Sequence, residues 1–105
     1  KLSNIDEIIT PKVDIDSTHV FHLYVVRAEK RDKLKIFLES KGIGTAIHYP
    51  TILPMLDCYH HLNYSINDFP IGNKLSSEIL SIPMFPEMTS EEINYVCQAI
   101  RDFYL

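Results

Sequence analysis

The sequence predicts an α+β domain, in which a small antiparallel or mixed sheet of three to four strands is covered by helices. Three observations favour this fold class. Residues 19–28 are rich in β-branched and aromatic types, which is typical of a strand. Two segments, around Leu34 and around Val96, carry apolar residues at helical spacing. Strand and helix patterns alternate in the order β-α-β-loop-α-β-α, which one sheet with helices on one side accommodates.

Size and charge narrow the class of protein. The 105 residues are enough for about one domain, and an apolar share of 46% is ordinary for a globular chain. A net charge of −4 argues against nucleic-acid binding, because phosphate contacts need clustered basic residues. We interpret the densest basic group as the solvated face of a helix; it comprises Lys30, Arg31, Lys33 and Lys35.

Targeting signals and cysteines indicate the compartment. The sequence shows no secretion signal and no apolar run long enough to span a bilayer, so we expect a cytoplasmic protein without a membrane segment. Cys58 and Cys97 are too few for a disulfide framework, and Cys97 is expected to be a small core residue.

The first third of the chain is expected to contain a lead-in and a strand. Residues 1–18 are interpreted as the lead-in, because Thr10, Pro11 and the polar residues after them interrupt a mildly apolar start. Residues 19–28 are expected to form a strand that is buried on most of both faces.

The next elements are a helix and a short strand. Leu34, Phe37 and Leu38 form an i, i+3, i+4 stripe, and Gly42 lies where a left-handed C-cap is needed. Residues 45–49 are expected to form a second strand, which Pro50 ends because proline has no N–H for the ladder.

A loop, a helix and a third strand are expected in the second half. Residues 51–67 are interpreted as a long loop with a helical turn. Asp68 is expected to cap a helix that has Pro70 in its first turn. The inner face of that helix would carry Ile71, Leu75 and Ile79, and residues 80–83 would form the strand.

The last helix has the clearest start. Thr89 followed three residues later by Glu92 is a capping box. The apolar stripe of this helix comprises Ile93, Val96, Cys97, Ile100 and Phe103.

His48 and Tyr49 are the main candidates for chemistry. They end the short strand at 45–49, at an edge that a ligand can reach. Either they cap this edge and pack locally, or they line a cleft in which His48 donates or accepts a proton or a hydrogen bond. His19 and His22 are three apart in a predicted strand, which places them on opposite faces, and no zinc-site spacing is present. We therefore expect no metal site.

Four ordered blocks resemble one family. Residues 19–27 read HVFHLYVVR and resemble the HVYHLYVIR strand of the DegT/StrS-type sugar aminotransferases. Residues 42–50 read GIGTAIHYP and resemble the GIGTGIHYP segment of these enzymes. Residues 81–86 (SIPMFP) and 89–96 (TSEEINYV) resemble the LSLPMFP and LTEEEIDYV segments. Together the four blocks span about residues 19–104.

The resemblance implies a pyridoxal-phosphate enzyme of fold type I. Such an enzyme moves an amino group, usually from glutamate, to a keto group on a nucleotide-linked sugar, and it works as a homodimer. Residues 19–105 resemble its C-terminal small domain, and residues 1–18 would lead in from a preceding large domain. The lysine that carries the cofactor, and most other cofactor ligands, would belong to that large domain, so the chain alone is expected to be inactive.

The resemblance also assigns site residues. His48 and Tyr49 match the segment that faces the substrate, and His22 and Tyr24, on one face of the first strand, are secondary substrate-side candidates. Ala46 replaces the usual glycine of this segment. Some relatives are dehydratases with the same fold, so that reaction remains an alternative. From the residues alone, a non-enzymatic ligand-binding or regulatory module, or a dimerisation domain, also remains open.

Overall fold

The chain, described for residues 1–105 by a computed structural model, is built on a three-stranded antiparallel sheet. The strands lie in the order β1 (Ile8–Ile9), β2 (Tyr24–Ala28) and β3 (Ile79–Ile82). The α+β class expected from the sequence is confirmed. Residues 45–49 add only an isolated bridge, in which Ala46 pairs with Ser81 on the free edge of β3. The longer strand expected there does not form: Ala46 alone pairs with β3, and Pro50 follows, which has no N–H for a ladder.

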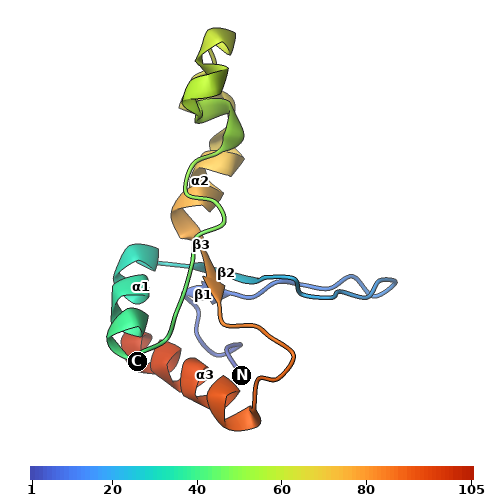
Figure 1. Ribbon diagram of the computed structural model, residues 1–105, viewed down its shortest axis with the longest axis vertical. Coiled ribbons are helices and arrows are strands. Elements are labelled where there is room, and N and C mark those ends of the chain that lie inside the picture. The colour runs from blue at the N-terminus through green and yellow to red at the C-terminus, as the bar shows by residue number, and fades with distance from the viewer.

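Two helices cover one face of the sheet (Figure 1). They are α1 (Arg31–Ser40) and α3 (Ser90–Tyr104), which also pack on each other. Alternate strand residues turn toward them, since side chains in a strand alternate between faces. The centre of the core is fully buried and comprises Val26, Leu34, Leu38, Leu80 and Ile100.

The first residue of α1 corrects the expected solvated basic face. Arg31 is only 8% exposed. Its Nη1 donates to the carbonyl of Ile79 at 2.8 Å and its Nε donates to the carboxylate of Asp32 at 2.7 Å. Arg31 therefore ties the start of α1 to the start of β3, since a buried guanidinium must find acceptors.

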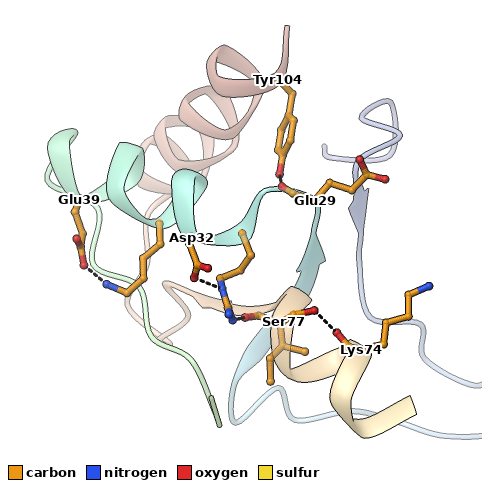
Figure 2. Close-up of polar contacts among 9 residues, drawn as sticks. Glu29, Asp32, Glu39, Lys74, Ser77 and Tyr104 are labelled. Carbon is orange, nitrogen blue, oxygen red and sulfur yellow. Dashed lines mark hydrogen bonds and ion pairs between the residues drawn. The ribbon is translucent and has the colours of Figure 1, made fainter. Parts of the chain in front are cut away.

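The start of α3 is the predicted capping box. The Thr89 hydroxyl accepts from the N–H of Glu92 at 3.2 Å, and the Glu92 carboxylate accepts from the N–H of Thr89 at 2.8 Å. Of the expected stripe, Val96, Cys97 and Ile100 are buried and Phe103 is partly buried, whereas Ile93 is exposed. At the other end of α3, the hydroxyl of Tyr104 donates to the carbonyl of Glu29, as Figure 2 shows.

The N-terminal residues join the core. Ile8 pairs with Ala28, and Leu2, Ile5 and Ile8 are buried. A two-residue strand is too short to show alternation in a sequence, which is why β1 was not predicted. Residues 1–9 thus pack with the domain that was expected to begin at residue 19; whether a further domain precedes them stays a prediction.

The strand β2 is shorter than expected. It begins at Tyr24 rather than at residue 19. Phe21 has a φ of 47°, in the left-handed region, and its N–H donates to His19 Nδ1 at 2.8 Å. This local turn interrupts the extended backbone before the strand starts.

Two segments project from the core (Figure 1). Residues 10–23 run out and back as an extended loop, and residues 50–78 form an arm. The arm holds α2 (Pro70–Glu78) and three short 3₁₀ helices, which are Leu53–Met55, Asp57–Leu62 and Ile66–Asp68. The radius of gyration is 15.7 Å, whereas a compact chain of this length has about 13 Å.

The start of α2 differs from the expectation. Asp68 instead ends the preceding 3₁₀ helix and completes a capping box there, because its carboxylate accepts from the N–H of the N-cap residue Ser65 at 2.8 Å. The N-cap of α2 is Phe69, without a side-chain hydrogen bond, and Pro70 follows in the first turn as predicted. The expected inner face is also wrong, since Ile71 is 75% exposed and Ile79 already belongs to β3.

Helix length and composition also bear on membrane insertion. No helix of the chain combines the length and the apolar content that crossing a bilayer requires.

Candidate functional site

His48 lies on the face of the sheet that the helices leave open. Its Nδ1 atom is 2.8 Å from the Oγ atom of Ser81 in β3. Ser81 alternates with Leu80, whose side chain faces the core, so the Ser81 side chain lies on the opposite face. Two main-chain hydrogen bonds between Ala46 and Ser81 bring the two segments together. The site therefore stands on paired backbone.

The other nitrogen of the His48 ring is free. Nε2 makes no hydrogen bond within the chain, and it is not a buried atom, because the one buried side-chain polar atom without a partner is Thr45 Oγ1. An accessible ring nitrogen next to an anchored one can donate to or accept from a ligand. This is the arrangement that the functional interpretation of His48 requires.

Tyr49 lies beside an apolar groove. The Tyr49 and His48 rings meet edge to face, with centroids 5.4 Å apart, and the peptide bond between the two residues is cis. Tyr49 is 73% exposed and lines a groove of about 630 Å³ between residues 49–54 and α2. At this groove, Gly72 of α2 lets the Ile52 side chain lie close to the helix, since a Cβ at position 72 would be 3.3 Å from that side chain.

His22 and Tyr24 do not join this site. His22 lies before β2 and is exposed, so the shared strand face expected for the two residues does not form. Tyr24 pairs with Ile82 on the helix-covered face. Its ring is tilted against the ring of Phe21, with the two centroids 5.3 Å apart. It lines a second, mostly apolar cavity of about 580 Å³ together with Met84 and Cys97. The structure thus places Tyr24 on the opposite sheet face from the His48 site and leaves His22 outside the sheet.

An ion pair on the open face holds the arm. Arg27 of β2 contacts the Glu78 carboxylate through both Nε and Nη2 at 2.8 Å. Glu78 is the last residue of α2, and Arg27 lies on the same sheet face as Ser81. The pair therefore connects the base of the arm to the sheet beside the His48 site.

The lysines show how far this chain could serve a Schiff-base cofactor. Such a cofactor needs a lysine inside a water-excluding site. None of the seven lysines is buried, and the least exposed one, Lys35, pairs with Glu39 on the surface of α1. The residues of this chain do not by themselves fit pyridoxal phosphate.

Sequence reasoning missed Ser81 as a site residue, although the signal was present. Ser81 is the one polar residue in the strand Ile79–Ile82. A polar side chain in an otherwise apolar strand needs a hydrogen-bond partner, and here the partner is His48. The ion pair of Arg27 and Glu78 has no comparable signal in the sequence, since 50 residues separate the two residues and both residue types are common on protein surfaces.

Comparison with protein families gives a match over nearly the whole chain. The model of the DegT/DnrJ/EryC1/StrS aminotransferase family matches residues 1–101. A relative from Geobacillus stearothermophilus, named pleiotropic regulatory protein, is 41% identical over 94% of this chain and 27% of its own length. A dTDP-3-amino-3,6-dideoxy-alpha-D-galactopyranose transaminase from Aneurinibacillus thermoaerophilus is 34% identical over 89% of this chain and 25% of its own length.

A solved structure agrees with these matches. DesV from S. venezuelae, solved in complex with a ketimine intermediate, superposes with a TM-score of 0.92 and 28% identity. The superposition covers 98% of this chain and 28% of that one. The chain thus spans about a quarter of the length of the relatives that it matches.

Proposed function

This chain belongs to the DegT/DnrJ/EryC1/StrS aminotransferase family, and from that premise we propose that it is part of a longer, pyridoxal-phosphate-dependent enzyme. In this proposal, residues 19–105 are its C-terminal small domain, to which residues 1–9 add the strand β1. The enzyme transfers an amino group from glutamate to the keto group of a nucleotide-linked sugar. The observation that carries the proposal is the match of residues 1–101 to a family whose members are about four times as long.

The shape of the chain supports a missing partner domain. The loop at 10–23 and the arm at 50–78 leave large apolar side chains exposed, among them Val13, Ile15, Leu53 and Ile71. Exposed apolar surface of this kind marks an interaction site. We propose that a large domain outside this chain covers it and provides the lysine for the cofactor.

The division of roles follows from the site. The cofactor supplies the electron sink for the chemistry at the amino-bearing carbon. His48 and Tyr49 contact the sugar nucleotide from the open face of the sheet, where His48 keeps Nε2 accessible. His22 and Tyr24 lie farther away in this proposal and shape the surroundings of the cleft.

Assembly and location complete the proposal. In this proposal the complete enzyme is a homodimer, as the family resemblance implies, and part of the exposed apolar surface of the two projections lies at the subunit interface. It acts in the cytoplasm, where nucleotide-linked sugars and glutamate are its partners.

The test uses the complete polypeptide that contains this chain. We expect the complete polypeptide to transfer nitrogen from glutamate to a keto-sugar nucleotide when it is loaded with pyridoxal phosphate, and to lose this activity when residues 1–105 are deleted. The 105-residue chain alone should be inactive. Loss of water from the sugar nucleotide without nitrogen transfer would identify a dehydratase instead, and activity of the isolated chain would overturn the proposal.

A further inference from the structure

We propose that Ser81 is a positioning residue that fixes the tautomer of His48. The Ser81 hydroxyl donates to Nδ1, so the neutral ring carries its proton on Nε2 and presents an N–H donor to an acceptor oxygen of the substrate. This inference rests on the proposed function, in which His48 contacts the sugar nucleotide. It adds the residue that orients His48 and the direction of the hydrogen bond.

The direction of the hydrogen bond between Ser81 and His48 follows from the hydrogen-bonding capacity of the Ser81 hydroxyl. A hydroxyl has one proton to donate. Ser81 is 6% exposed, and the contact with His48 Nδ1 at 2.8 Å is the one hydrogen bond of its Oγ atom. If Nδ1 carried the ring proton, the Ser81 proton would have no acceptor at a buried position, which folded proteins avoid. When Oγ donates instead, every buried donor of the pair is satisfied.

The support of Ser81 makes it suited to this role. Its main chain pairs on both sides, in register with Val25 of β2 and through two hydrogen bonds with Ala46 at 2.8 and 3.1 Å. The hydroxyl therefore stands on rigid backbone, and a group held in this way loses little freedom when it orients its partner. His48 follows Ala46 by two residues, which places both on the same side of the chain.

The tautomer decides which substrate atoms His48 can recognise. A ring that presents N–H binds an acceptor, such as a sugar keto oxygen or a phosphate oxygen, and a neutral ring in this form is no base at Nε2. Both oxygens belong to a nucleotide-linked keto-sugar, and the test separates them by the ligand used.

The kinetic test compares S81A, S81T and the control S77A in the complete polypeptide. The Ser77 hydroxyl donates only to the carbonyl of Lys74 at 2.7 Å on the exposed arm. We expect S81A to raise KM for the sugar nucleotide about threefold to tenfold, with kcat changed less than about twofold, because one neutral hydrogen bond is misdirected. S81T, which keeps a hydroxyl at this position, should have the wild-type KM, and so should S77A. An unchanged KM in S81A would overturn the inference.

Two further measurements separate the source of the oxygen and the tautomer itself. Weaker binding of the free nucleoside diphosphate by S81A would support a phosphate oxygen as the acceptor, whereas unchanged diphosphate binding with a raised KM would support a sugar oxygen. Nitrogen NMR of the ¹⁵N-histidine-labelled polypeptide should show His48 protonated on Nε2, with mixed tautomers in S81A. Protonation on Nδ1 would overturn the inference, even if the polypeptide proves to have no transferase activity.

Discussion

Two tyrosines of α3 donate to main-chain carbonyls, yet their surroundings differ. Tyr95 donates to the carbonyl of Lys41 at 2.9 Å and is exposed, whereas Tyr104 donates to the carbonyl of Glu29 and is partly buried. Burial, with smaller contributions from the nearby carboxylates of Glu7 and Glu29, raises the pKa of Tyr104 from 10.0 to about 12. The fold therefore favours the neutral phenol of Tyr104.

This shift predicts a loss of stability at high pH. The folded chain keeps the Tyr104 proton up to a pKa of about 12, whereas the unfolded chain releases it near 10.0. The contribution to stability is thus complete below pH 10 and disappears as the pH rises toward 12. A shift of two units corresponds to about 2.7 kcal/mol at full burial, and solvent screening reduces this to about 1 kcal/mol.

Chemical denaturation of the chain at several pH values between 9 and 12 measures the effect. Relative to wild type, the free energy of unfolding of Y104F should fall less over this interval. Y95F, which also removes a donor to a main-chain carbonyl, should keep the wild-type fall. Identical pH profiles for Y104F and wild type would contradict the assignment.

The glycines beside the site offer a second test at this scale. Gly42 follows α1 and has a φ of 73°, where a Cβ is strained, while Gly44 lacks such a φ; a Cβ at either position would meet no atom within 4 Å. We expect G42A to lower the free energy of unfolding by about 1 kcal/mol. G44A should change it by less than about 0.5 kcal/mol. Urea denaturation measures both values. Equal losses of unfolding free energy in G42A and G44A would mean that the left-handed backbone at Gly42 does not cause the loss in G42A.

Among the elements, the arm is attached to the sheet by few groups. Arg27 and Glu78 form the ion pair at its base, and Arg31 donates to the carbonyl of Ile79, where α2 passes into β3. The arm has no fully buried residue of its own. The direction of α2 therefore depends on polar contacts at one end.

Breaking the ion pair should loosen α2 more than the core. We expect E78Q to increase amide hydrogen exchange in α2 about threefold to tenfold, because a partly exposed pair of this kind stabilises by about 1 kcal/mol. Exchange in α3 should stay the same. The control K74A removes a weaker contact with Glu78 at 3.9 Å and should change exchange in α2 little. Unchanged exchange in E78Q would show that the groove side chains alone hold the arm.

The elements also show what a sequence can reveal. The capping box at Thr89 and the stripe of α3 were predicted because their signals are local: a cap and a period of 3.6 residues. The strand β1 and the buried state of Arg31 depend on contacts with residues that are distant in the chain, so no local pattern indicates them. His48 and Tyr49 stay predicted substrate contacts. Ser81 stands out in the sequence as a polar residue in an apolar strand, but its pairing with His48 depends on the contact of β3 with Ala46.

For the whole molecule, more than half of the large exposed apolar side chains lie on the two projections. At the start of the chain, Ile8 is buried in the core, while Ile9 and Val13 are exposed. Further exposed side chains line the arm and include Leu53, Leu56, Leu62, Tyr64 and Ile71. Exposed apolar side chains gathered in this way should drive association of the isolated chain.

The last prediction concerns this surface. We expect the isolated chain to self-associate as its concentration rises, and the double variant L53K/I71K, with both changes on the groove of the arm, to shift sedimentation toward the monomer. The control I36K changes an equally exposed apolar residue on α1, away from the projections, and should sediment as the wild type does. Ultracentrifugation over a wide concentration range decides the matter. A strictly monomeric wild-type chain would mean that the arm does not need a covering partner, and the proposed contact with a large domain would lose its main structural support.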